Sequence, residues 1–211
     1  MDKTLIKKAI SQLREQNSRK FTQSVDMIVN LKNFNVKQQS VNTVITLPHT
    51  KGREVKVAAF AGQELVDEAK AHCGLVITQS QFGEYDVKAM KKLAQEYDYF
   101  IAQASIMAKV AQAFGKVLGS RGKMPDPKMG CVVPPNASLG PLVEKLKNTI
   151  VFKSKKSLNL MSIIGNESMS DEDIVENVET AYKMLVKALP NEEQNIKNVQ
   201  LKLTMGSPIT L

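Results

Sequence analysis

Aromatic residues are scarce in this 211-residue chain: Trp is absent, and Phe, Tyr and Trp together make up only 5%. We therefore do not expect the chain to stack several nucleic-acid bases on a row of rings. Hydrophobic residues still account for 43% of the chain, with ten methionines, so Leu, Ile, Val and Met must fill the core. That content is sufficient for one or two folded domains.

Cysteine is also rare, because the chain has only Cys73 and Cys131, far apart and without a C-x-x-C pair. This spacing argues against a disulfide framework and against a structural zinc site. We expect both thiols to be small core residues in a reducing compartment, and we expect no metal or other cofactor.

Long apolar runs are missing as well. No stretch approaches the roughly 18 apolar residues of a membrane-spanning helix, and the first 16 residues are charged throughout, unlike a secretory signal. We therefore expect a soluble cytoplasmic protein that makes no membrane contact.

Catalytic signatures are absent too. His49 and His72 lie in different segments, the chain has no G-x-S-x-G or H-E-x-x-H pattern, and we expect no D-x-D cluster to supply metal ligands. A lone His is more often structural, so we predict that the chain is not an enzyme.

What the chain has in excess is positive charge, with a formal net charge of +8 and a pI near 9.4. Lys and Arg gain affinity for polyanions by displacing counterions from phosphates. The segment from 157 to 211 is the exception, with four basic and eight acidic side chains. Most of these acids fall in one predicted helix, which begins at a capping box from Ser170 to Asp173 and ends before Pro190. We expect that helix to lie away from the nucleic acid.

The two ends of the chain show helical and two-residue hydrophobic periods. The spacing predicts an amphipathic helix at 5–13 and half-buried strands at 21–31, 158–163 and 199–205. A further strand at 42–47 stops at Pro48, and the chain is predicted to return along 55–60 as a hairpin.

The middle of the chain has a different pattern. Apolar runs without alternation at 75–78 and 99–102 are separated by helical patterns, at 63–71, 87–95 and 106–114. Strands of this kind are typical of a sheet covered on both faces. We therefore predict an α/β protein: an α+β domain built from residues 1–65 plus 157–211, with an inserted three-layer, Rossmann-like α/β domain at 66–156. Two adjacent crossings between them can act as a hinge.

Two polar clusters from opposite ends of the chain are the candidate binding site, which we expect on one edge of a sheet. In the first, Arg19 and Lys20 can neutralise phosphates, Phe21 can pack on a sugar or base, and the hydroxyls of Thr22 and Ser24 can bond ribose or phosphate. An ordinary solvated strand start explains this cluster somewhat better from position alone. The second cluster closes the last strand, and a plain strand exit explains it equally well; it comprises Thr204, Met205, Gly206, Ser207 and Pro208, and Lys202 and Gln200 share the face of Thr204.

The central run Leu118–Pro125 superficially suggests a phosphate-binding loop. A P-loop requires G-x-x-x-x-G-K-[ST], but Val117 occupies the first Gly position and Met124 replaces the hydroxyl. ATP binding is therefore not expected. Arg121 and Lys123 can instead touch RNA or tRNA electrostatically, and a purely structural loop is about as probable.

The two terminal clusters and the central run, in this order along nearly the whole chain, closely resemble the ribosomal protein L one family, with an archaeal character. Leu47, Pro48, His49 and Gly52 fit the same family. Ser120, where the family usually has Pro, and Ser207, which precedes Pro208, depart from it.

The resemblance implies a structural constituent of the large ribosomal subunit, at the mobile stalk beside the tRNA exit site. It implies binding to large-subunit (23S) rRNA through Lys20, Phe21, Ser24, Thr204, Met205 and Gly206. It further implies assistance in the release of deacylated exit-site tRNA, repression of translation through the protein's own mRNA, and a monomer off the ribosome.

Two alternatives remain open. The α/β insertion can be a nucleotide site of an enzyme, with the termini as its scaffold. The chain can also be a DNA-binding or messenger-binding regulator that acts independently of ribosomes.

Overall fold

The computed structural model describes residues 2–16, 19–35, 40–154 and 157–211. The chain forms two compact units: unit 1 comprises Met1–Arg53 with Asn148–Leu211, and unit 2 comprises Glu54–Lys147. The crossings therefore lie earlier in the sequence than the expected positions near 65 and 157.

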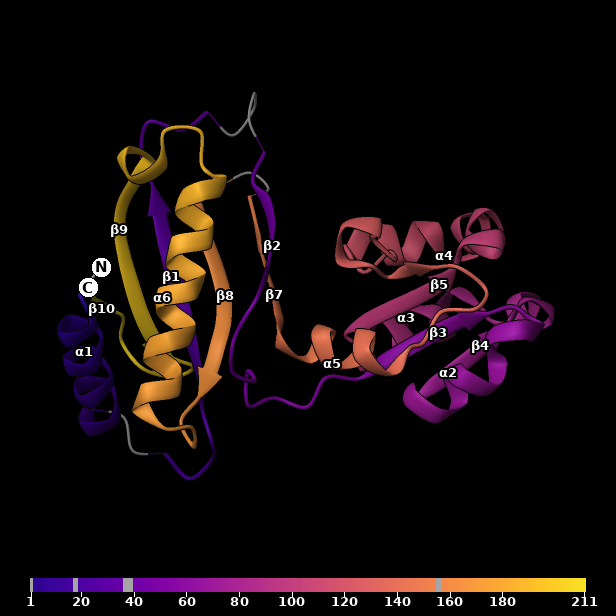
Figure 1. Cartoon of the computed structure of the whole chain (residues 1–211), viewed down its shortest axis with the longest axis horizontal. Coiled ribbons are helices and arrows are strands. Elements are labelled where there is room, and N and C mark those ends of the chain that lie inside the picture. Colours follow the sequence, from indigo (N-terminus) through magenta and orange to yellow (C-terminus); the bar gives the residue numbers. More distant parts are fainter. Residues whose placement is uncertain (1, 17–18, 36–39, 155–156) are drawn as a thin grey trace. The chain divides into compact units, whose positions relative to one another are not determined.

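Unit 1 is built on an antiparallel sheet with the strand order β10-β9-β1-β8 (Figure 1). Along β1 (Ser24–Leu31), odd-numbered side chains are buried and even-numbered ones are half-exposed, as the two-residue period predicts. The strands on either side of it are β8 (Asn159–Asn166) and β9 (Ile196–Leu203), and β10 (Ile209–Thr210) pairs with β9.

One face of this sheet is covered by α1 (Lys3–Gln16) and α6 (Asp171–Ala188). Apolar residues of α1 such as Ile6 and Leu13 share one buried cluster with Met27 of β1 and Val178 of α6. The predicted capping box is partly confirmed: the hydroxyl of Ser170 accepts a hydrogen bond from the backbone N–H of Asp173, at 3.2 Å. On the other face of the sheet, even-numbered residues of β1 such as Asp26 and Asn30 are half-exposed.

The predicted hairpin between 42–47 and 55–60 is wrong. Instead, β2 (Asn42–Thr46) pairs antiparallel with β7 (Thr149–Lys153), which belongs to unit 1 and not to the insertion. The partner predicted for it, β3 (Val57–Ala61), is buried at every position and lies in the sheet of unit 2. A strand that is apolar on both faces needs cover on both faces, and a hairpin in a half-open sheet would not provide it.

Unit 2 contains a parallel sheet with the strand order β4-β3-β5-β6 (Figure 1). Its strands are β3, β4 (Leu75–Thr78), β5 (Tyr99–Gln103) and β6 (Val132–Val133). The α/β fold class is confirmed.

Helices cover both faces of this sheet. On one face, α3 (Val87–Glu96) and α4 (Met107–Arg121) pack around Phe60, whose ring centroid lies 4.9 Å from that of Phe114. On the other face lie α2 (Val66–His72) and α5 (Gly140–Asn148), around Ile101 and Leu139. Short 3₁₀ segments occur at Gln63–Leu65, Gln79–Glu84, Ala104–Ile106, Pro127–Met129 and Glu192–Asn195.

The predicted helix at 106–114 is too short. It continues through Leu118 to Arg121 and stops at Gly122, which has a left-handed φ of 68° that favours glycine. The first half of the predicted central loop is therefore the last turn of α4.

Candidate nucleic-acid interface

The two terminal clusters meet where the start of β1 lies beside the end of β9. The strands are antiparallel neighbours, with Val25 opposite Leu203 and Asp26 opposite Lys202. The expected sheet edge is incorrect, because β1 and β9 are inner strands and the clusters lie at the ends of these strands. We call this region the sheet-end surface; it comprises residues 19–24, Gln200, Lys202 and residues 204–207.

The strands are also shorter than predicted. Regular pairing begins at Ser24, so Phe21 and Thr22 precede β1, and it ends at Leu203, so Thr204 and Met205 form a turn. The N–H of Gly206 closes this turn by donating to the carbonyl of Leu203, at 3.0 Å.

A pair of hydroxyls joins the two clusters. The Oγ1 of Thr204 accepts a hydrogen bond from the backbone N–H of Ser24 at 3.0 Å and lies 2.9 Å from its Oγ. The N–H of Thr204 in turn donates to the carbonyl of Ser24, at 3.2 Å. Since each hydroxyl has one donor and two acceptor positions, the pair retains capacity for a further partner.

Gln23 is a residue of this surface that the sequence pattern did not single out as a binding residue. Its side chain is fully buried directly before β1, and its Oε1 accepts a hydrogen bond from the N–H of Met205, at 3.1 Å. A buried polar residue at an otherwise apolar position was the available signal.

Large side chains project from the surface around these bonds. Phe21 is 53% exposed and Met205 is 61% exposed, and Arg19, Lys20 and Thr22 are exposed as well. These segments thus offer two cations and two apolar side chains to solvent. A shallow hollow in this region is lined by Arg19, Lys20, Phe21, Thr22, Glu167 and Ser168.

Glu167 and Ser168 reach the hollow from the turn between β8 and α6. Antiparallel pairing of β1 with β8 sets Ser24 opposite Asn166, so this turn must lie beside the start of β1. The N–H of Glu167 donates to the carbonyl of Gln23 at 2.9 Å, and the N–H of Gln23 is 3.3 Å from the Oε2 of Glu167. The sequence reading did not place this acidic residue in the site.

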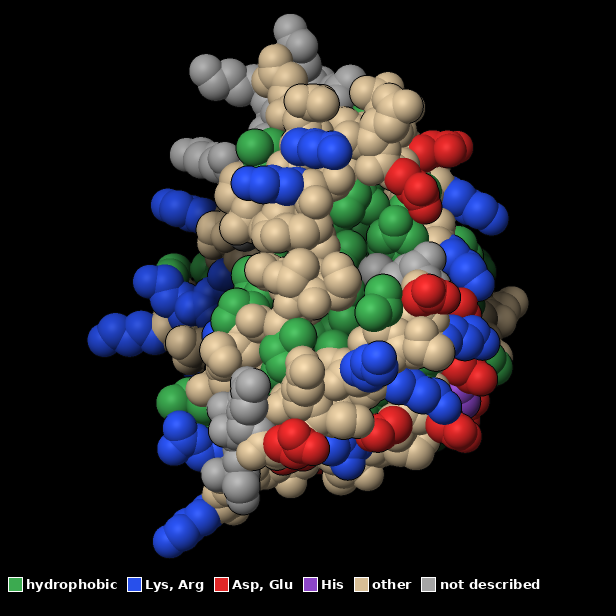
Figure 2. All heavy atoms as spheres, turned by 90° about the vertical axis from the view of Figure 1, so that its left-hand side faces the viewer, with side chains coloured by type: hydrophobic (Ala, Val, Ile, Leu, Met, Phe, Trp, Pro, Cys, Tyr) green, Lys and Arg blue, Asp and Glu red, His purple; other side chains and the backbone are tan. Residues whose placement is uncertain are grey.

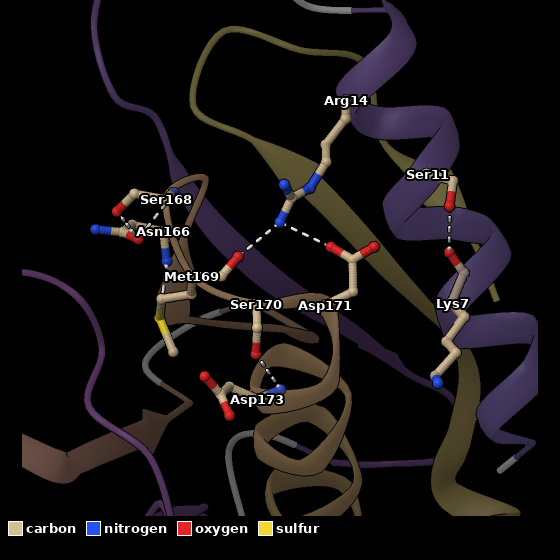
Figure 3. A network of polar contacts seen from close by, with 9 residues as sticks. All are labelled: Lys7, Ser11, Arg14, Asn166, Ser168, Met169, Ser170, Asp171 and Asp173. Carbon is tan, nitrogen blue, oxygen red and sulfur yellow. Dashed lines mark hydrogen bonds and ion pairs between the residues drawn. The ribbon is translucent and has the colours of Figure 1, made fainter.

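The same turn is held from several sides, as Figure 3 shows. Arg14 of α1 donates from Nη2 to the carbonyl of Met169 at 2.7 Å and pairs with Asp171 at the same distance. The side chain of Asn166 accepts from the N–H and Oγ of Ser168, at 3.1 and 2.8 Å, and donates to the carbonyl of Gly52 at 2.7 Å. These bonds fix the backbone that carries Glu167.

The open face of the sheet carries Gln200 and Lys202, both half-exposed. Gln200 donates from Nε2 to the Oγ1 of Thr210, at 3.1 Å. Next to Lys202, burial raises the pKa of Asp26 above its ordinary value, and the Lys202 charge only partly opposes this. Burial thus disfavours the ionised form of this carboxylate relative to a carboxylate in water.

Acidic side chains gather on one side of the face shown in Figure 2. Several acids of α6 are already paired: Asp171 with Arg14, Glu172 with Lys7, and Glu179 with Lys3 and Lys183. His49 contributes to the same region, since its Nε2 lies 2.8 Å from the Oε2 of Glu176.

Arg121 and Lys123 belong to unit 2. The ammonium of Lys123 donates to the carbonyl of Tyr97 at 2.7 Å, which ties the start of the loop after α4 to the end of α3. Arg121 is half-exposed in the last turn of α4.

Among the described residues, no group of three or more His, Cys, Asp or Glu side chains is placed to hold a metal ion. In the same part of the chain, no helix is long and apolar enough to cross a bilayer. Burial raises the pKa of both Cys73 and Cys131 to about 11, so neither thiol is activated as a nucleophile.

Comparison with known proteins gives a consistent result. Residues 13–207 match the model of the Ribosomal protein L1p/L10e family. A relative from Methanobrevibacter smithii is 41% identical, with 94% of each chain covered, and one from Nanoarchaeum equitans is 37% identical, over 95% of this chain and 96% of the relative. A third, from Methanothermococcus thermolithotrophicus, is 38% identical over 99% and 98%. All three are named large ribosomal subunit protein uL1.

Proposed function

The chain belongs to the Ribosomal protein L1p/L10e family, and from this premise we propose that it is a structural constituent of the large ribosomal subunit that binds large-subunit rRNA through the sheet-end surface. Family membership confirms the prediction that the chain is not an enzyme, since these relatives are named as ribosomal proteins. It also supports a location with ribosomes in the cytoplasm.

The observation that carries the proposal is the contact between Ser24 and Thr204, 180 positions apart. Their hydroxyls are held by hydrogen bonds where two paired strands end, so a ribose 2′-OH or a phosphate oxygen meets them without much further loss of conformational entropy. The 2′-OH is the group that distinguishes RNA from DNA. A rigid hydroxyl pair therefore favours recognition of folded RNA by its shape.

Electrostatics support the same assignment. Arg19 and Lys20 are exposed at the hollow, and Lys202 lies on the open face of the adjacent strand. Their charges are placed to neutralise phosphates, and phosphate contacts position a protein on RNA. Phe21 is the exposed ring that can pack on one sugar or base.

The finer roles are part of the same proposal. We propose that the protein lies at the mobile stalk, assists release of deacylated exit-site tRNA, and represses translation by binding its own mRNA through the surface that binds rRNA. Arg121 and Lys123 are the residues of unit 2 proposed to contact RNA; the bond from Lys123 to Tyr97 leaves Arg121 as the better candidate. Off the ribosome we expect a monomer.

The test is Thr204→Val, which keeps the side-chain volume but removes the hydroxyl. Affinity for a 23S rRNA fragment should fall by about 1–3 kcal/mol, because Ser24 loses its partner as well. Filter binding measures this, and calorimetry should show little change in melting temperature because residue 204 is exposed. Thr46→Val, at an exposed position of β2, is the matched control and should bind normally.

Unchanged affinity of Thr204→Val would count against the proposal. Displacement of the RNA by duplex DNA at equal concentration would favour a DNA-binding regulator, since the 2′-OH would then play no part. Tight binding of a nucleotide in isothermal titration would favour the α/β unit as an enzyme site. Sedimentation of the tagged protein with large subunits tests the assignment to the ribosome.

A further inference from the structure

The hollow in the sheet-end surface contains a negative charge that RNA binding alone does not explain. Glu167 lines it together with Arg19 and Lys20, and these residues have no ion pair with one another among the described part of the chain. A carboxylate repels phosphates, so its position in a surface that binds RNA calls for a hydrogen-bond donor on the ligand.

The position of this carboxylate is fixed by its surroundings. Its Oε2 lies 3.3 Å from the N–H of Gln23, and the backbone of Glu167 is bonded to the carbonyl of the same residue. Arg14 and Asn166 hold the rest of the turn (Figure 3). One oxygen of the Glu167 carboxylate thus accepts a long hydrogen bond from Gln23, and the carboxylate is already placed at the hollow before any ligand binds.

Among the RNA bases, guanine fits a carboxylate best. Its Watson–Crick edge has two adjacent donors, N1–H and the N2 amino group, which match the two oxygens of a carboxylate. The donor of adenine or cytosine is flanked by a ring-nitrogen acceptor, and the single donor of uracil is flanked by carbonyl oxygens, so each would place an acceptor against an oxygen of Glu167. The Watson–Crick edge is accessible only in an unpaired nucleotide.

Other groups of the hollow suit an unpaired nucleotide as well. Phe21 is half-exposed and can stack on a single base, and Arg19 and Lys20 can hold the flanking phosphates. From this combination we propose that the hollow is a subsite for one unpaired guanosine of the bound RNA, read by Glu167. The inference rests on the proposed function and specifies which base the RNA presents there.

The alternative is that Glu167 serves only to bond the N–H of Gln23. Glu167→Gln separates the two roles, because the amide keeps an oxygen for Gln23 but replaces the second acceptor with a donor. The change also removes a negative charge, which by itself strengthens RNA binding. A loss of affinity therefore has the opposite sign to the general electrostatic effect.

The experiment uses the full chain and a 23S rRNA fragment containing scattered inosine phosphorothioates. Inosine lacks the N2 amino group, so a guanosine read by Glu167 should show interference when replaced. With the native chain we expect one unpaired guanosine to interfere, and with Glu167→Gln we expect that interference to disappear while affinity falls about tenfold.

Glu172→Gln is the control, since it removes an acidic charge that is 82% exposed on the first turn of α6. It should keep the interference and should not weaken binding.

The proposal is overturned if the native chain binds the RNA without inosine interference in an unpaired region, or if Glu167→Gln leaves the interference in place. Failure of the native chain to bind the RNA at all would instead refute the proposed function. Hydrogen exchange at the Gln23 amide, unchanged in Glu167→Gln, verifies that the local fold persists.

Discussion

Units 1 and 2 differ in how many faces of their sheets are covered by helices. In unit 1 the helices cover one face, and β1 alternates between buried and half-exposed side chains. In unit 2 helices cover both faces, and every residue of β3 is buried. A half-covered sheet can present side chains from rigid strands, whereas a fully covered sheet leaves binding to loops and helix surfaces. Gln200 and Lys202 of the candidate interface lie on the open sheet face of unit 1.

The largest expected effects come from core substitutions, each of which should destabilise only one of the two units. Phe60→Ala should destabilise unit 2 by about 3–5 kcal/mol, and Met27→Ala should destabilise unit 1 by about 2–5 kcal/mol, because both side chains are fully buried. Hydrogen exchange measured on peptides of each unit should show the loss of protection in the mutated unit. Phe60→Ala should retain its affinity for RNA, whereas Met27→Ala should lose it. Equal losses of affinity in the two variants would mean that RNA binding is not a property of unit 1 alone.

A smaller effect is expected from removing single charges. Lys20→Gln should reduce the slope of log affinity against log salt by about one, because one phosphate contact is lost. Lys88→Gln, which removes an exposed lysine of α3 in unit 2, is the matched control and should leave the slope unchanged. Filter binding across a salt series measures both slopes. Equal slopes for the two variants would contradict the assignment of the RNA contact to unit 1.

The open sheet face of unit 1 should give a pH-dependent stability. The pKa of Asp26 is raised in the folded state, so its protonated form favours folding, and this contribution is lost as pH rises through the folded pKa. Asp26→Asn mimics the protonated form and should be more stable than the native chain at neutral pH. Urea unfolding should show the advantage shrinking below about pH 4, near the ordinary pKa of Asp. A constant difference across pH would contradict the assignment.

The last expectation concerns the thiols of unit 2, whose reactivity does not affect RNA binding by unit 1. Since burial raises the pKa of Cys73 and Cys131 to about 11, their thiolate population at neutral pH should be about a hundredfold below that of a thiol with the ordinary value of 9.0. Alkylation by iodoacetamide, followed by mass spectrometry, should be correspondingly slow for both. Fast modification of Cys131, which is buried, would show that unit 2 opens more readily than its core packing implies.

Local pattern was a good guide where one structural preference dominated. The apolar run at 75–78 coincides with β4, the alternation after position 23 gives the buried face of β1, and Ser170 caps α6 as predicted. It failed for β3, where proximity in sequence suggested a hairpin although continuous burial required the parallel sheet. It also missed β7, whose pairing with β2 joins residues about a hundred positions apart.

The candidate site shows the same division. Exposed residues such as Lys20, Phe21 and Met205 were named from the sequence because charge, an aromatic ring and a family resemblance marked them. Glu167 was missed, since an acidic residue is not unusual in its segment, and Gln23 lay within the first cluster but was given no binding role. Their importance comes from neighbours supplied by other strands.

By itself, the sequence determined the basic character of the chain, the alternation of its terminal strands and the apolar middle that must be covered on both faces, because these depend on local composition and period. Tertiary structure alone decided that Ser24 meets Thr204 and that Glu167 reaches the hollow beside Phe21. Such contacts are set by strand register, and register depends on the packing of the whole sheet against α1 and α6.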